Sequence, residues 1–377
     1  MKRFPVQHLL ILNMKRLVFY STLLLTTLFG FTASAENRFV YLSAGGSVTV
    51  YEVDLETGLL SEFQKNEGSG LTAITKKQNR LYRVGGKEVE SYRIQKNGKL
   101  KSMGKEPTEA KGGFLGLDAT ERFLAGSDYG GGSVAVWQIG EDGIAKGNPV
   151  SEMALEKAAH SSHFSPGNGF LIVPATTPNK VFQIRFDEKT GALKPNDPAS
   201  VSGPTGEGTA QQPRHIRFHP NGKIAYTTLE RESPGVGVWS WDEESGHLTL
   251  LQNLITIPEG FEGSITTADL HLTPDSKFLY VSNRDLTDRK ALTGKSSIVG
   301  FRVDPESGLL TLIGHTHCPQ VPRSFAIDRA GEYLYAAGQT ASKLEVFRIN
   351  QDSGELTSIQ ILDTGKGPNW VLCVTKP

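Results

Sequence analysis

Cysteine is scarce in this chain, because only Cys318 and Cys373 occur among its 377 residues. Two cysteines cannot build the dense disulfide framework of small secreted domains, and they form no zinc-ligand motif. A single bridge between them stays open as an alternative. Cys373 lies in an apolar strand sequence, Trp370–Val374, so two buried thiols are the preferred interpretation. We expect neither a metal ion nor a cofactor.

An excess of charge of one sign is also missing. Lysine plus arginine total 40, and aspartate plus glutamate total 40. This balance provides no broad positive field for a phosphate backbone, so nucleic acid is not an expected partner. The chain also lacks the Gly-x-Ser-x-Gly motif that surrounds the nucleophilic serine of many hydrolases. Covalent catalysis by such a serine is therefore not indicated.

Long apolar runs are missing except near the N-terminus. There, Lys15 and Arg16 precede an apolar run from Leu17 to Phe31, and Ala33-Ser34-Ala35 supply the small residues that signal peptidase accepts. We expect residues 1–35 to be a signal peptide and residues 36–377 to be the mature periplasmic or secreted protein, with no membrane span after cleavage. An uncleaved anchor is the alternative, but the run falls short of the roughly 20 apolar residues that a bilayer requires.

Glycine, by contrast, is abundant, and seven of the 41 glycines mark one recurring unit. In each unit an alternating apolar segment leads to a polar turn, a glycine and a further apolar residue: VYEVDLETGLL, VESYRIQKNGKL, VAVWQIGEDGI, VFQIRFDEKTGAL, VGVWSWDEESGHL, IVGFRVDPESGLL and LEVFRINQDSGEL. The alternation predicts strands, and the polar residue followed by glycine predicts a tight hairpin turn.

A second strand–turn–strand unit precedes most of these hairpins, as in FHPNGKIAYTTLE and LTPDSKFLYVSNR. Together the two units supply four strands per repeat, which predicts an all-β, seven-bladed β-propeller with four-stranded antiparallel blades. The first repeat lacks an inner strand, whereas the C-terminal GPNWVLCV resembles an inner strand without a blade. We therefore expect the N- and C-terminal strands to pair in one blade and close the ring.

Equivalent positions can be compared because the repeats align without gaps near their turns. One position, six residues before the turn prolines, is expected to face the central channel and holds Gly70, Gly113, His160, Arg214, Ala268, Arg323 and, from the C-terminal strand, Asn369. A second channel position, in the next strand, holds Gly45, Gly86, Tyr129, Thr176, Glu230, Arg284 and Gln339.

The histidine and the charged members of both sets come from consecutive later repeats. They are His160, Arg214, Glu230, Arg284 and Arg323. Three arginines against one carboxylate leave a positive excess, and the planar guanidinium suits a carboxylate or phosphate ligand. Histidine and glutamate are common proton carriers. The alternative is that these groups only pair with one another in a wet channel.

Four further segments are informative: AAHSSHFSP, QPRHIRFHPNGKIAYTTLE, FLYVSNR and PRSFAIDRAGEYLYAAGQ. With the hairpins, they resemble the lactonase propeller family over essentially the whole mature chain. Its members include bacterial 6-phosphogluconolactonase and fungal 3-carboxymuconate lactonising enzyme. The resemblance implies a catalytic histidine, an arginine and a glutamate sixteen residues apart, and a further arginine. These roles fall on His160, Arg214, Glu230 and Arg284. The expected substrate contacts are Arg323, Gln339 and, if its strand bulges toward the channel, His215.

The resemblance further implies hydrolysis of a sugar lactone, such as glucono-1,5-lactone or 6-phosphogluconolactone. Glu230 or His160 would activate water, and the arginines would stabilise the oxyanion. The secretion signal weighs against the phosphorylated substrate, since a pentose-phosphate intermediate should be absent outside the inner membrane. Two alternatives stay open. One is an exported propeller that only binds a sugar acid or a protein, and the other is a lactonising enzyme that uses the same contacts in reverse.

The export signal gives a direct prediction. The protein recovered from the periplasm or medium of an expressing cell should begin at Glu36 in N-terminal sequencing, because the small residues before it fit signal peptidase. Recovery of a membrane-bound chain that retains residues 1–35 would instead identify an uncleaved anchor.

Overall fold

A computed structural model describes residues 37–376 of the chain, apart from 68–70, 75–78, 86, 207 and 292–293. The predicted signal peptide, Gly70 and Gly86 therefore lie outside the described residues. The part of the chain that is described contains strands and turns but no helix. This part of the chain therefore holds no helix that is long and apolar enough to cross a bilayer.

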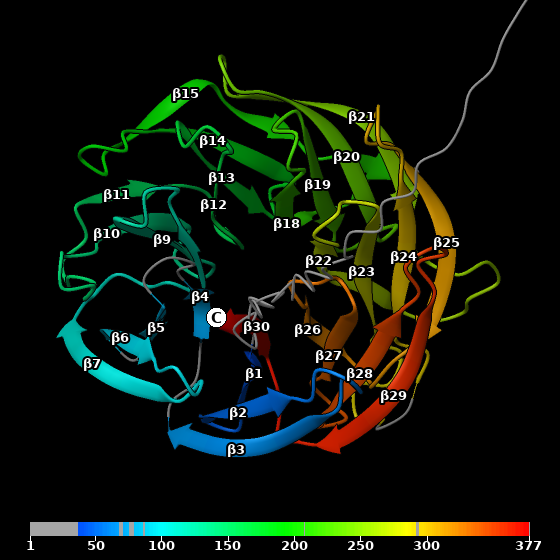
Figure 1. The fold of residues 1–377 in the computed structure, drawn as a ribbon. Coiled ribbons are helices and arrows are strands. Elements are labelled where there is room, and N and C mark those ends of the chain that lie inside the picture. Colours follow the sequence, from blue (N-terminus) through cyan, green and yellow to red (C-terminus); the bar gives the residue numbers. More distant parts are fainter. Residues whose placement is uncertain are drawn as a thin grey trace, which may run out of the picture. The chain divides into compact units, whose positions relative to one another are not determined.

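Seven four-stranded antiparallel sheets form a ring (Figure 1), which confirms the predicted fold class. Blade 1 consists of β1 (Asn37–Ala44), β2 (Ser47–Val53), β3 (Leu60–Glu67) and β30 (Trp370–Lys376); blade 2 of β4 (Leu71–Ile74), β5 (Arg80–Gly85), β6 (Glu88–Ile94) and β7 (Leu100–Pro107); and blade 3 of β8 (Phe114–Leu117), β9 (Phe123–Asp128), β10 (Ser133–Gln138) and β11 (Ser151–Ala154).

The other four blades follow in chain order. Blade 4 consists of β12 (His163–Phe164), β13 (Phe170–Ala175), β14 (Lys180–Phe186) and β15 (Leu193–Ser202); blade 5 of β18 (Pro213–Phe218), β19 (Ile224–Leu229), β20 (Gly235–Asp242) and β21 (His247–Ile255); blade 6 of β22 (Ile265–Leu272), β23 (Phe278–Asp285), β24 (Ser297–Val303) and β25 (Leu310–His317); and blade 7 of β26 (Pro322–Ile327), β27 (Tyr333–Gly338), β28 (Lys343–Ile349) and β29 (Leu356–Asp363). Between blades 4 and 5, β16 (Thr205–Gly206) and β17 (Thr209–Ala210) form a small hairpin.

The ring closes through blade 1, as predicted from the chain ends. The C-terminal strand β30 pairs antiparallel with β1, from Ser43 opposite Trp370 to Asn37 opposite Lys376. It thus occupies the innermost place in a sheet whose other three strands come from the N-terminus. This pairing covers the inner edge of β1, which would otherwise be unpaired.

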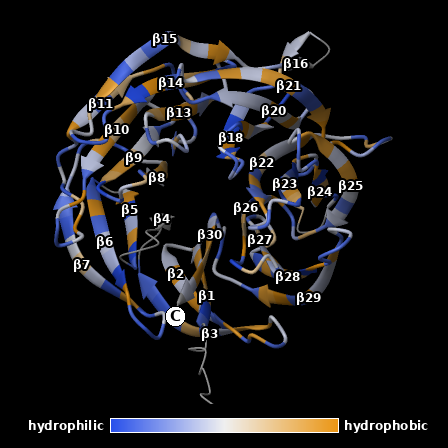
Figure 2. Cartoon of the chain, turned by 45° about the horizontal axis from the view of Figure 1, so that its top comes forward, coloured by the Kyte–Doolittle hydropathy of each residue, from blue (hydrophilic) through white to orange (hydrophobic). Residues whose placement is uncertain are grey.

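The hydrophobic core lies between adjacent blades rather than within one of them. For example, Phe39 and Tyr41 of blade 1 pack with Leu81 and Tyr92 of blade 2 in one buried cluster. Hydrophobic and hydrophilic residues alternate along many strands (Figure 2). Side chains of a strand point alternately to its two faces, but both faces of a blade meet neighbouring blades, so the exposed positions concentrate in the outermost strands, such as β3 and β29.

The two cysteines are unpaired. Cys318 packs against the cluster that contains Phe325, and Cys373 against the cluster that contains Tyr335. Burial raises the pKa of both thiols well above the ordinary value. Both side chains therefore act as small apolar groups in the core, as the preferred sequence interpretation expected.

The seven hairpin glycines have a second role, in the packing of one blade on the next. All seven have φ between +72° and +79°, and a Cβ at any of them would come within 2.9 Å of a side chain in the preceding blade. The contacts join Gly58 to Tyr333, Gly98 to Phe39, Gly143 to Arg80, Gly191 to Phe123, Gly246 to Phe170, Gly308 to Ile224 and Gly354 to Phe278. Each partner lies at or near the start of the second strand of its blade, so the contacts run around the entire ring.

A matched pair of glycine substitutions tests this packing. Gly58 and Gly46 have nearly the same φ, +79° and +78°, but a Cβ at Gly58 would lie 2.1 Å from the Tyr333 ring whereas one at Gly46 would meet nothing within 4 Å. Gly46→Ala should lower the free energy of unfolding by about 1 kcal/mol, the cost of a left-handed backbone. Gly58→Ala should lower it by about 1–3 kcal/mol more, through overpacking. Equal losses in urea denaturation would contradict the contact.

Candidate active site

The predicted site residues come from two strand positions at one end of the channel. His160, Arg214 and Arg323 lie just before or near the start of the innermost strands β12, β18 and β26. Glu230, Arg284 and Gln339 lie at or just past the end of the second strands β19, β23 and β27. Since these strands are antiparallel neighbours, the end of one meets the start of the other. All six therefore lie near the same mouth.

Irregular pairing in the inner strands decides which side chains face the channel. The register between β18 and β19 shifts between Pro213 and Ile216, and comparable shifts occur in β22 and β26. A bulge of this kind breaks the strict alternation of side chains, so consecutive residues can turn to the same side. Arg214 and His215 are indeed both buried and both line one cavity. The condition set for His215, a strand that bulges toward the channel, is met.

A cavity of about 600 Å³ lies at this mouth. Five predicted site residues line it, namely His160, Glu230, Arg284, Arg323 and Gln339. A smaller cavity of about 120 Å³ adjoins it, and Arg214 and His215 line that one together with His160 and Arg323. The structure thus brings all seven predicted residues to two cavities that share His160 and Arg323 in their walls.

Glu230 is the anionic centre of the site. Its Oε1 accepts a hydrogen bond from Arg284 Nη2 at 2.7 Å, and its Oε2 lies 3.8 Å from Arg214 Nε. Burial opposes ionisation of this carboxyl, but Arg214 and Arg284 outweigh it and hold its pKa below the usual range. Glu230 is therefore a carboxylate at neutral pH, and it orients two guanidinium groups.

His160 is a neutral imidazole. Burial, followed by the charge of Arg214, lowers its pKa well below the ordinary value. Its ring meets Tyr129 edge-on at 5.5 Å and His215 at 5.1 Å between centroids. Its Nδ1 has no hydrogen-bond partner among the described residues. A neutral ring at a cavity wall can accept a proton from bound water.

Arg323 provides a guanidinium that is free to bind a ligand. It lines both cavities and forms no hydrogen bond or ion pair with the residues that the structure describes. Gln339 lines the larger cavity beside it. These positions fit the expected substrate contacts, although their roles stay predictions.

Position counting missed two arginines at the mouth, Arg231 and Arg289, which also line the larger cavity. Arg231 lies 3.9 Å from Glu230 Oε1, and Arg289 lies in the connection between β23 and β24. Neither occupies a repeated strand position, so comparison of the repeats could not select them. The unusual length of the connection after Asp285 was the available signal. The two arginines increase the positive excess of the site.

A family model agrees with this architecture. The model described as "Lactonase, 7-bladed beta-propeller" matches residues 40–373. The chain belongs to this lactonase family. Within it, the chain is 35% identical over 283 residues to the 6-phosphogluconolactonase of Pectobacterium carotovorum subsp. carotovorum, which covers 75% of this chain and 80% of the relative. It is 31% identical over 346 residues to the 6-phosphogluconolactonase of Serratia proteamaculans, covering 90% and 99% of the two chains.

Among solved structures, this lactonase is similar to the periplasmic gluconolactonase PpgL of Pseudomonas aeruginosa, with a TM-score of 0.78 and 27% identity over 90% of this chain and 100% of that one. A crystal structure of a putative 6-phosphogluconolactonase from Bacteroides fragilis also has a TM-score of 0.78, at 20% identity over 91% and 99% of the two chains, and shows the shared fold. These relatives support the assignment of the chain as a lactone hydrolase.

The buried ion pairs predict how stability depends on pH. Glu230→Gln should lower the free energy of unfolding at pH 7 by about 3 kcal/mol, because it leaves Arg214 and Arg284 buried beside an uncharged amide. Glu230 titrates at about 4.3 in the unfolded chain and at a lower pH in the folded one. The wild type should therefore keep its full advantage above about pH 5 and lose it as the pH falls through the folded-state pKa.

Urea denaturation of both proteins at several pH values measures this difference. Glu244→Gln, at an exposed position of the hairpin between β20 and β21, is the matched control and should change little at any pH. A difference for Glu230→Gln that stays constant down to pH 3 would contradict the ion-pair account.

Proposed function

We propose that this lactonase hydrolyses an aldonolactone, with glucono-1,5-lactone as its substrate, and that it does so without a covalent enzyme intermediate. The observation that carries the proposal is the convergence of a neutral imidazole, a paired carboxylate and five arginines on two adjoining cavities of a lactonase propeller. A lactone carbonyl needs an activated water on one side and cationic donors at its oxygen, and these residue types supply both.

His160 is the better candidate for the general base. Glu230 Oε1 already accepts a hydrogen bond from Arg284, and Oε2 faces Arg214 Nε at 3.8 Å, so the carboxylate is committed to the two guanidinium groups. His160 has an unpartnered ring nitrogen and is neutral. In this scheme Glu230 orients the arginines, and His160 takes the proton of the attacking water.

The reaction then balances within the site. The water oxygen bonds to the lactone carbonyl carbon while His160 takes a proton, and the carbonyl oxygen becomes an oxyanion beside Arg214 and Arg284. Collapse of this intermediate breaks the ring C–O bond, and His160 returns the proton to the leaving alkoxide oxygen. The product is the open hydroxy acid. Pre-placed donors at a buried oxyanion typically contribute about 10²–10³-fold each to kcat.

The remaining arginines fit the charge of the product. Arg289 and Arg323 form no hydrogen bond or ion pair with the described residues. Opening of any aldonolactone yields a carboxylate, so the positive excess requires no phosphate on the substrate. The relatives named 6-phosphogluconolactonase support a phosphorylated substrate, whereas the predicted signal peptide and the likeness to a periplasmic gluconolactonase support export and an unphosphorylated one.

An assay on the mature protein, residues 36–377, tests the proposal. The wild type should accelerate the opening of glucono-1,5-lactone above the buffer rate, as followed by acid release at constant pH. Arg214→Ala combined with Glu230→Ala should abolish the acceleration, because both the oxyanion donor and its orienting carboxylate are gone. His160→Gln should lower kcat by about 10²-fold, within the usual range for a general base.

Controls make the result specific. Arg329→Ala removes an exposed arginine outside both cavities and should retain wild-type kinetics. The 6-phosphate of the same lactone, assayed in parallel, identifies the preferred substrate. Binding of gluconate without turnover of either lactone would favour a sugar-acid binding protein instead, and equal rates for the wild type and the double variant would refute the proposed site.

A further inference from the structure

Asp269 is a buried carboxylate that the proposed reaction does not use. It lies on the inner strand β22, one residue after Ala268, where the pairing with β23 is irregular. Its side chain is about 1% exposed, yet it is not at either repeated channel position. A fully buried carboxylate is costly unless its oxygens are well bonded.

Both oxygens of Asp269 have defined partners. Oδ1 lies 2.8 Å from His215 Nδ1 and accepts a hydrogen bond from the backbone N–H of Leu270 at 3.0 Å. Oδ2 lies 3.3 Å from His271 Nε2. Arg217 Nη2 is 3.9 Å from Oδ1. The carboxylate therefore links a residue of the candidate active site to the opposite end of the inner strands.

The contact with Arg214 reveals which tautomer His215 adopts. Arg214 Nη1 lies 3.1 Å from His215 Nε2. A guanidinium has only donors, so Nε2 must accept, and the ring proton must be on Nδ1. Nδ1 then donates to Asp269. Burial, followed by the charge of Arg214, lowers the pKa of His215 to about 3, so the ring stays neutral in this arrangement.

Strand β22, which carries Asp269, also contacts Arg214 directly. Arg214 Nη1 also donates to the carbonyl oxygen of Ala268, the residue before Asp269. One segment of β22 thus fixes the guanidinium directly through a backbone carbonyl and indirectly through Asp269 and His215. We propose that Asp269 is a positioning residue, which sets the His215 tautomer and thereby the orientation of Arg214 at the reacting carbonyl. This inference rests on the function proposed for Arg214.

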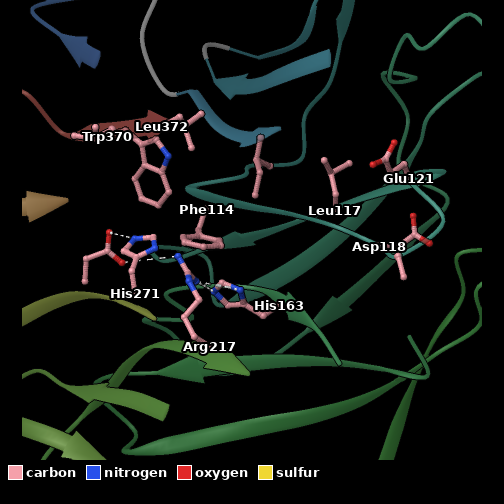
Figure 3. A pocket seen from close by; sticks show the side chains of 13 residues that line it. Phe114, Leu117, Asp118, Glu121, His163, Arg217, His271, Trp370 and Leu372 are labelled. Atoms are coloured by element: carbon pink, nitrogen blue, oxygen red, sulfur yellow. Dashed lines mark hydrogen bonds and ion pairs between the residues drawn. The ribbon is translucent and has the colours of Figure 1, made fainter. Parts of the chain in front are cut away.

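Asp269 contacts two histidines, and we call the contact of Oδ1 with His215 the His215 arm and that of Oδ2 with His271 the far arm. The far arm reaches a separate cavity of about 560 Å³, toward the far ends of the inner strands. Figure 3 shows His271, Arg217 and His163 together there, with Phe114 and Trp370 beside them. A competing explanation is that Asp269 only pairs with Arg217 and His271 in this cavity. The two histidine contacts can be separated because they use different oxygens, whereas Arg217 lies nearer the oxygen that His215 uses.

Three variants separate the arms. Asp269→Ala removes both. Asp269→Asn should keep the His215 arm, because the two donors at Oδ1 require the amide oxygen at that place. His271→Gln changes the far arm alone. If Asp269 positions Arg214, Asp269→Ala should lower kcat by about 10- to 100-fold, the typical effect of a misplaced reacting group, with KM changed less than about threefold. Asp269→Asn and His271→Gln should stay within about threefold of the wild type.

Nuclear magnetic resonance gives a readout that does not depend on turnover. In ¹⁵N-labelled wild type at pH 7, His215 should have its proton on Nδ1, and the held guanidinium of Arg214 should give resolved Nη signals. Asp269→Ala should lose both signatures and Asp269→Asn should keep them, with His215→Gln used for assignment. This experiment applies even if no lactone proves to be a substrate, so the two proposals fail separately.

Several results would overturn the inference. An Nε2-protonated or charged His215 in the wild type would remove its basis. A His271→Gln variant as slow as Asp269→Ala would assign the effect to the far cavity. Loss of activity in Asp269→Asn with the tautomer preserved would show that the negative charge matters, rather than the position of Arg214.

Discussion

The contact of each hairpin glycine with the preceding blade is the constraint on which this ring depends. A side chain at the start of one blade's second strand fills the space where the next blade's glycine lacks a Cβ. The contact recurs seven times and includes the junction of blades 7 and 1, between Tyr333 and Gly58. It fixes how far one sheet can slide or rotate on its neighbour. Only with that spacing fixed can inner strands from different blades present side chains to one another at hydrogen-bond distance.

The candidate site makes use of this spacing. Glu230 of blade 5 reaches Arg284 of blade 6, and His215 of blade 5 reaches Asp269 of blade 6. Each pair crosses a blade junction and lies in nearly complete burial. Charges buried this way stabilise little in total, since desolvation offsets most of the attraction. Their benefit is orientation, because a guanidinium that is already aimed needs no reorganisation when negative charge develops beside it.

The sequence predicts the architecture and most of the site, for reasons that can be identified. The seven turn glycines and the alternation before them are local signals, and so the blade number and the closure by β30 follow from them. Arg214, Glu230 and Arg284 could be selected because they occupy repeated positions. Asp269 could not, because it faces the channel through an irregularity in pairing, and such an irregularity depends on the neighbouring strand. The corresponding position in blade 5, His215, was the one hint.

Two aromatic residues at the inner end of the site bear on how a ligand enters and leaves it. Phe114 and Trp370 line both the small inner cavity and the cavity toward the far strand ends, and their rings meet edge-on at 5.3 Å between centroids. His215 packs against Phe114 at 5.2 Å. These aromatic side chains form a wall that the two cavities share. In the proposed reaction the lactone and the acid formed from it occupy the same arginine-lined cavity, so the product must leave before the next lactone can bind.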